Sequence, residues 1–294
     1  MKKHAIIGAS GLVGENLFRV LQASDVDVNG TSNKQEIQGL DQLDIKSSVD
    51  VQNYINMTKP AYIYLPAALT NVEYCETNPE ESYGSNVLGV ENVVRACNQI
   101  GAKLIFFSSD YIFDGRNGPY PEDATANPIS VYGIHKLIAE HYITAFCQDF
   151  IIVRTTVVYG WERQLKNFVG QLISTLREGI TFNTPIDQIG SPTYAPNLAA
   201  AVLKLALSSY HGIINLAGAD LISKYEFACE AAKAFDLDPA LVTPVTTAKL
   251  KQLALRPLNA GMTTMKANAM QTYLLGYKEG LKEMSNTARN YCES

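Results

Sequence analysis

The chain has 294 residues, of which 47% are hydrophobic and 18% charged, and its formal net charge at pH 7 is −5. This composition is ordinary for a globular protein, and the acidic balance gives no reason to expect nucleic acid or an anionic membrane surface as a partner. The five cysteines include no C-x-x-C or other metal-ligand spacing, which favours reduced thiols in a cytoplasmic protein. Glycines interrupt the apolar opening, and no apolar run approaches the length of a membrane span, so we expect neither a signal peptide nor a membrane protein.

Short apolar runs alternate with longer amphipathic segments through the first 160 residues. We expect strands at residues 4–9, 26–32, 61–67, 103–109 and 150–160, and helices at residues 12–22, 47–59, 80–100 and 132–147. Pro60 and Gly101 stop two of these helices. This alternation predicts an α/β fold with a doubly wound parallel sheet, of Rossmann type, covered by helices on both faces.

The pattern loosens after Gly160. Helical segments are expected near residues 164–178, 195–207, 224–235 and 278–291, between short apolar strands such as GIINLAG. We therefore predict two domains, residues 1–160 and a smaller C-terminal α/β lobe over residues 161–294, and we allow for the chain crossing back to the first domain.

The segment GASGLVG follows the first expected strand directly and opens the first helix. In this context glycines let the backbone approach a pyrophosphate, with helix N–H groups facing it. A strand-to-helix turn rich in small residues would look the same, but the context favours dinucleotide binding by residues 1–160. The expected cofactor contacts of this loop are Gly8, Ser10, Gly11, Leu12, Val13 and Gly14.

The end of the second strand reads GTSNK, where dinucleotide-binding proteins usually place an acid that holds the ribose 2′-hydroxyl. An acid would repel a 2′-phosphate. Its absence, with Ser32, Asn33 and Lys34 as donors, favours NADP (NADPH) over NAD, although NAD use stays open and Lys34 could be a solvated loop lysine. The other expected cofactor contacts are Asp44, Ile45, Ala67 and Ala68.

The stretch VYGIHK places Tyr132 one helical turn before Lys136, a spacing that chance alone produces about once in such a chain. Ser109, however, ends the preceding strand, at the sheet edge where α/β proteins bind ligands. Together the three side chains suit carbonyl reduction, in which hydride reaches carbon and the oxygen needs a proton. The ammonium is expected to lower the tyrosine pKa from about 10, while the serine hydroxyl bonds the oxygen.

Several motifs run in order along nearly the whole chain: GASGLVG, AALTNVEYCETNPE, SNVLGVENV, FSSDYIFDG, YPEDATANPISVYGIHKLIAE, VRTTVVYG, DQIGSPTYAPNLA and RPLNAGM. On these motifs the chain resembles an extended short-chain dehydrogenase/reductase, most closely the dTDP-4-dehydrorhamnose reductase family. The resemblance implies that Ser109, Tyr132 and Lys136 are catalytic, with Tyr132 as proton donor and Lys136 on the nicotinamide ribose. It also implies hydride transfer from NADPH to the 4-keto group of a nucleotide-linked deoxysugar.

The resemblance also guides the substrate side. The segment DQIGSPTYAPNLA is similar to the one that reaches the substrate in this family, although it could be a plain polar turn, and Arg256 could bind the substrate pyrophosphate or form a surface ion pair. The expected substrate contacts are Asp110, Tyr111, Gln188, Ser191, Thr193 and Arg256. A homodimer is possible. We assign no metal, because the acids of the metal site that bridges dimers in the family have no counterpart that we can place.

Three functions remain open on the sequence: a sugar-nucleotide 4-ketoreductase, an epimerase on the same scaffold, and a non-catalytic NADP-binding subunit. The epimerase would need an acid–base pair, and no clear Cys/His partnership is present. The third function is considered because the carboxyl part, from SKYEFACEAAKAFDLDP to RPLNAGM, also resembles the β regulatory subunit of methionine adenosyltransferase.

Overall fold

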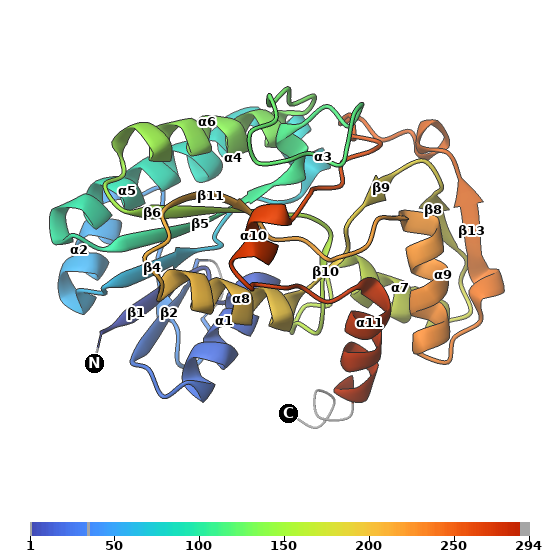
Figure 1. Cartoon of the computed structure of the whole chain (residues 1–294), viewed down its shortest axis with the longest axis horizontal. Coiled ribbons are helices and arrows are strands. Elements are labelled where there is room, and N and C mark those ends of the chain that lie inside the picture. Colours follow the sequence, from blue (N-terminus) through green and yellow to red (C-terminus); the bar gives the residue numbers. More distant parts are fainter. Residues whose placement is uncertain (1, 34–35, 289–294) are drawn as a thin grey trace.

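The computed structural model describes residues 2–33 and 36–288, and its centre is a seven-stranded sheet (Figure 1). The strand order is β11-β6-β5-β4-β1-β2-β3, and every pairing is parallel. The doubly wound parallel sheet predicted from the sequence is thereby confirmed. The strands are β1 His4–Ile7, β2 Val28–Ser32, β3 Asp41–Gln42, β4 Tyr62–Leu65, β5 Lys103–Ser109, β6 Phe150–Thr155 and β11 Gly212–Asn215.

Helices cover both faces of the sheet because each carries one apolar stripe. One face packs against α2 (Ser48–Thr58), α5 (Gly89–Ile100) and α6 (Val131–Phe146), with a core that includes Ile55, Val93 and Ile143. The opposite face packs against α1 (Leu12–Ala23), α8 (Ala195–Ala206) and α10 (Met265–Ala269), with a core that includes Leu17 and Leu198.

The last strand of the central sheet comes from far along the chain. β11 pairs with β6 over Gly212–Asn215, and α8 packs on α1, so residues beyond 160 complete the sheet and one of its covering layers. The chain thus returns to the first part of the fold after residue 160. The domain boundary at residue 160 stays a prediction.

The remaining residues form a smaller group of elements beside the carboxyl ends of the strands, at the right of Figure 1. Its core surrounds Leu172 and Phe227. It contains α7 Phe168–Arg177, α9 Lys224–Ala234 and α11 Tyr277–Asn286, and the strand pairs β8 Phe182–Pro185 with β13 Val242–Val245, β9 Ile189–Gly190 with β12 Ile222–Ser223, and β7 Val158–Tyr159 with β10 Thr193–Tyr194. The short helical segments of the whole chain are α3 Val72–Thr77, α4 Pro79–Tyr83, η1 Gly84–Leu88, η2 Asp110–Ile112, η3 Pro239–Leu241 and η4 Thr247–Leu250.

Two expected elements are divided in the structure. The expected strand over residues 150–160 ends at Thr155, because Val157 adopts a left-handed backbone (φ 41°) that an extended strand cannot contain. The expected helix over residues 80–100 begins at Pro79 and passes through a π-helical turn at Gly84–Leu88 before α5. None of the helices within the described ranges is long and apolar enough to cross a membrane.

Candidate active site

The glycine loop joins β1 to α1 at the point where the strand order reverses between β1 and β4. Gly8 has φ 101°, and a Cβ there would lie 2.7 Å from the Ala67 nitrogen. A Cβ on Gly14 would lie 2.1 Å from the Gly8 oxygen, so α1 can approach β1 this closely only without a side chain. At Gly11 the nearest atom would be 3.9 Å away, because this residue faces an open cleft.

The cleft beside the glycine loop has a volume of about 580 Å³. Gly8, Gly11, Leu12, Val13 and Gly14 line one part of it. Another part of the same wall consists of Ser109, Tyr132 and Lys136. The structure therefore brings the three candidate catalytic residues and the nucleotide loop into one space, which sequence spacing alone could not establish.

A second cavity, of about 320 Å³, adjoins the cleft and shares Gly8 and Gly11 with it. Of the expected cofactor contacts, Ser10, Asn33, Asp44, Ile45, Ala67 and Ala68 line this cavity. Ser32 is buried and lines none of the described cavities, while Lys34 lies outside the described residues.

Lys46 also lines the second cavity and was not predicted from the sequence. Its backbone nitrogen donates to Asp44 Oδ1 (3.0 Å), and its Nζ lies 3.7 Å from Asp44 Oδ2. The carboxylate beside this cavity thus has a cation next to it. A lysine one residue after the LDI motif was the available signal.

Ser109, Tyr132 and Lys136 come from adjacent elements. Ser109 ends β5, and the other two stand on the first turns of α6, whose N-cap Ser130 accepts a hydrogen bond from the Gly133 nitrogen. Ser109 and Tyr132 line the same cleft, and the Ser109 hydroxyl is near enough to affect the pKa of Tyr132. The Lys136 amine is buried and lies 4.3 Å from the centre of the Phe106 ring.

Burial is the largest influence on the pKa values of Tyr132 and Lys136. It raises the pKa of Tyr132, as does the carboxylate of Asp110, and the Ser109 hydroxyl opposes both. The expected lowering of the Tyr132 pKa was therefore wrong in net direction, because burial removes the phenolate from water and Lys136 is not among the groups that shift this pKa. Burial also lowers the pKa of Lys136 to about 8, against the charges of Glu140 and Cys75.

Asp110 follows Ser109 and is buried between the cleft and a third cavity. Its Oδ2 accepts a hydrogen bond from Thr156 Oγ1 (2.6 Å), and its Oδ1 accepts one from Ser109 Oγ (2.9 Å). Burial raises its pKa to about 6, against these hydrogen bonds and the charge of Lys224. The Asp110 carboxylate thus accepts a hydrogen bond from Ser109 on one oxygen and from Thr156 on the other.

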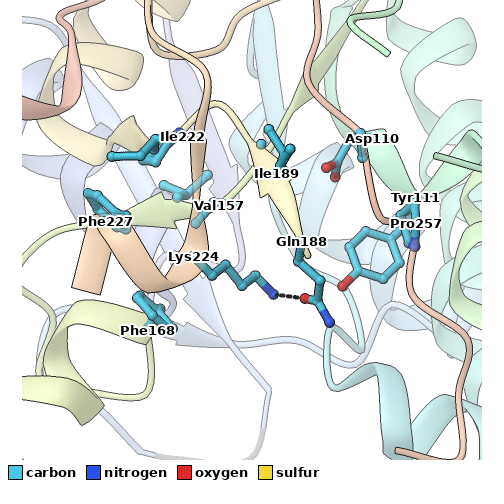
Figure 2. A pocket seen from close by; sticks show the side chains of 14 residues that line it. Asp110, Tyr111, Val157, Phe168, Gln188, Ile189, Ile222, Lys224, Phe227 and Pro257 are labelled. Carbon is cyan, nitrogen blue, oxygen red and sulfur yellow. Dashed lines mark hydrogen bonds between the residues drawn. The ribbon is translucent and has the colours of Figure 1, made fainter. Parts of the chain in front are cut away.

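The third cavity, of about 250 Å³, extends toward α9 and contains Gln188 and Lys224 (Figure 2). Tyr111, another expected substrate contact, also lines it. Ser191 and Thr193 are buried and line none of the described cavities; Thr193 Oγ1 donates to the Ser191 oxygen (2.9 Å) and accepts from the Gly218 nitrogen (3.1 Å). Lys224 was not predicted from the sequence.

Arg256 joins the carboxyl part of the chain to α3. Its Nη2 lies 2.8 Å from Glu73 Oε1, and its Cζ lies 5.8 Å from the centre of the Tyr111 ring. The Arg256 side chain is buried, and its Nη1 has no hydrogen-bond partner among the described residues. One of the two sequence alternatives, an ion pair, is therefore present, while part of the guanidinium keeps unused hydrogen-bonding capacity.

His135, which lies between Tyr132 and Lys136 in sequence, faces away from them. Its Nδ1 lies 2.8 Å from Ser82 Oγ, and the residue lines none of the described cavities. It therefore offers no acid–base partner on the substrate side. Across residues 2–33 and 36–288, no three His, Cys, Asp or Glu side chains form a group that could hold a metal ion.

Comparison with known proteins places this geometry in context. Residues 2–290 match the family model described as RmlD substrate binding domain. The dTDP-4-dehydrorhamnose reductase of Aggregatibacter actinomycetemcomitans is 31% identical over 281 residues, covering 90% of this chain and 92% of that protein. The crystal structure of dTDP-4-dehydrorhamnose reductase from Bacillus anthracis in complex with NADP has a TM-score of 0.89 and 29% identity, covering 97% of this chain and 99% of that one. Methionine adenosyltransferase 2 subunit beta of Xenopus tropicalis is 28% identical over 255 residues, 83% of this chain and 75% of that protein.

Proposed function

The chain belongs to the family described as RmlD substrate binding domain, and on this premise we propose that it is an NADPH-dependent sugar-nucleotide reductase. It reduces the 4-keto group of a nucleotide-linked deoxysugar, converting dTDP-4-dehydro-L-rhamnose to dTDP-L-rhamnose. One observation carries the proposal: Ser109, Tyr132 and Lys136 line the same cleft as the glycine loop. The 31% identity with a dTDP-4-dehydrorhamnose reductase supports it over nearly the whole chain.

The residues of the chain divide the chemistry among them, and bound NADPH supplies the hydride. Tyr132 donates a proton to the ketone oxygen, and its raised pKa keeps it in the protonated form that donation requires. Ser109 lines the cleft beside Tyr132 and can donate a hydrogen bond to the same ketone oxygen as charge develops there. Lys136 binds the nicotinamide ribose from the same helix face.

The groups around the second cavity fit NADP. Its wall includes Asn33 and Lys46, and β2 ends without a carboxylate that would repel a 2′-phosphate. The acid that is present, Asp44, already has the Lys46 amine 3.7 Å away. A phosphate on the ribose would therefore meet a donor and a cation in this cavity.

The proposed setting is a cytoplasmic homodimer that acts on a small-molecule nucleotide sugar and on no nucleic acid. Four described cysteines, Cys75, Cys97, Cys147 and Cys229, are free, which supports a reducing compartment. For the substrate, Asp110, Tyr111, Gln188 and Arg256 remain the proposed contacts. Ser191 and Thr193 are proposed to support the wall behind them.

A regulatory, non-catalytic function is the alternative, and the resemblance to methionine adenosyltransferase 2 subunit beta is the observation in its favour. The assembled Ser109, Tyr132 and Lys136 group favours the reductase, because a protein that only binds NADP has no need of a proton donor in the cleft.

One assay separates these functions. The purified protein is mixed with dTDP-4-dehydro-L-rhamnose and NADPH, then NADH, and oxidation of the nicotinamide is followed by absorbance. We expect turnover with a preference for NADPH, and Tyr132→Phe should lower kcat about 10²–10⁴-fold, the usual contribution of a general acid. Tyr273→Phe, which removes the same hydroxyl from an exposed tyrosine, should leave kcat unchanged. Full activity in Tyr132→Phe would refute its role, and copurification with an adenosyltransferase without turnover would favour the alternative.

A further inference from the structure

The third cavity places a lysine amine among mostly apolar walls. Val157, Phe168, Ile222 and Phe227 contribute apolar surface, and the polar groups facing the cavity are those of Asp110, Tyr111, Gln188 and Lys224. Asp110 and Tyr111 also line the cofactor cleft. A molecule whose ketone lies at Tyr132 would therefore extend past Asp110 toward Lys224.

Lys224 is held in position twice by one residue. Its backbone nitrogen donates to the Gln188 oxygen (2.9 Å). Its Nζ donates to Gln188 Oε1 (2.7 Å), the dashed line in Figure 2. The amide of Gln188 is itself oriented, because its Nε2 donates to Thr247 Oγ1 (3.0 Å) and that hydroxyl donates to Asp187 Oδ1 (2.7 Å). The amine is thus fixed before any ligand arrives, which reduces the entropy cost of using it.

Helix stability does not explain a lysine at this position. Lys224 is the first residue of α9, where the capping box of Ser223 and Glu226 already satisfies the end of the helix. A cation at a helix N-terminus opposes the helix dipole, so this lysine is electrostatically unfavourable for α9. Because Lys224 does not stabilise its own helix, it is a candidate for binding a ligand.

Lys224 and its neighbour Arg256 have hydrogen-bond donors available for an anion. An ammonium has three N–H donors, and within the described parts of the chain one of them has an acceptor, Gln188. The Arg256 guanidinium is near enough to lower the pKa of Lys224, and its buried Nη1 has no partner among the described residues. Burial lowers the pKa of Lys224 most, to about 8, and the Asp110 carboxylate raises it.

We propose that Lys224, oriented by Gln188, determines substrate specificity by donating hydrogen bonds to the diphosphate of the nucleotide sugar. The inference rests on the proposed function. A diphosphate carries several acceptor oxygens and at least two negative charges, which match spare donors on two neighbouring cations. Lysine acts on phosphate as a point charge, so it selects for the charged group rather than for a particular base.

Binding without turnover tests this assignment. Calorimetric titration of the NADP-loaded protein with dTDP should show that Lys224→Met weakens dTDP binding roughly 10- to 100-fold, the loss expected for a charge-assisted hydrogen bond. Lys224→Arg, which keeps the charge, should bind dTDP within about threefold of the wild type, as should Lys282→Met, which removes an exposed lysine of the same part of the chain. Unchanged NADPH affinity in Lys224→Met confirms that the variant is folded.

The possible outcomes separate the inference from the function on which it rests. If the wild type binds dTDP and Lys224→Met binds it equally well, the inference is overturned and the reductase proposal stands. The inference is also overturned if thymidine, which lacks phosphate, loses as much affinity as dTDP, because Lys224 would then contact the nucleoside. A wild-type protein that binds no nucleoside diphosphate would overturn both.

Discussion

Tyr132 is protonated because its surroundings disfavour the phenolate. Burial and the Asp110 carboxylate raise its pKa, and that carboxylate accepts a hydrogen bond from Ser109. The sequence could nominate Ser109, Tyr132 and Lys136 through the motifs around them, and the structure places all three on one cleft, although their spacing alone did not show this. The sequence could not reveal that Asp110 is buried or that Thr156, 46 positions later, donates to it, because both depend on packing between strands.

The buried carboxyl of Asp110 should make the stability of the fold depend on pH. Its pKa is about 6 in the fold, against an ordinary value of 3.8 for an exposed aspartate, so the folded protein holds this proton more tightly. The resulting stabilisation is complete below about pH 4 and is lost as the pH rises through 6, by roughly 3 kcal/mol in the free energy of unfolding. The Asp110→Asn variant does not titrate here. In urea unfolding, its free energy of unfolding should rise by that amount relative to the wild type between pH 4 and 7. The same change at the exposed Asp25 is the control, and a difference between wild type and Asp110→Asn that is flat with pH would contradict the burial argument.

At the scale of elements, the loop between β1 and α1 was predictable because its function depends on local geometry. A different constraint acts at each of its three glycines, however, and the sequence did not distinguish the three constraints. The break after β6 was not predictable either. Val157 is β-branched and has the character of a strand residue, yet its left-handed backbone ends β6 and turns the chain into the wall shared by the cleft and the third cavity.

Two substitutions in this loop should separate stability from cofactor binding. In Gly14→Ala the new methyl meets the Gly8 oxygen at 2.1 Å, so α1 must move and the free energy of unfolding should fall by roughly 1–3 kcal/mol. In Gly11→Ala the methyl points into the cleft, so urea unfolding should match the wild type while the NADPH dissociation constant rises about 10-fold or more. Wild-type NADPH binding by Gly11→Ala in a fluorescence titration would show that the cofactor does not lie against this residue.

At the scale of the whole molecule, the proposed substrate side depends on contacts between distant parts of the chain. Arg256 meets Glu73 across 183 positions, and Lys224 meets Gln188 across 36. Motif resemblance pointed to Arg256 and Gln188, but nothing local distinguished Lys224 from a solvated lysine. The sequence also allowed for a return of the chain to the first domain, but it did not locate the returning strand β11. A four-residue strand carries no signal for the sheet that it joins.

The most direct test of the reductase account follows the hydride itself. The protein is incubated with dTDP-4-dehydro-L-rhamnose and NADPH that carries two deuterium atoms at nicotinamide C4, and the product is analysed by mass spectrometry and NMR. The account predicts one deuterium on C4 of the sugar in dTDP-L-rhamnose, with one NADP formed per product. An unoxidised cofactor, or a product without deuterium at C4, would contradict it.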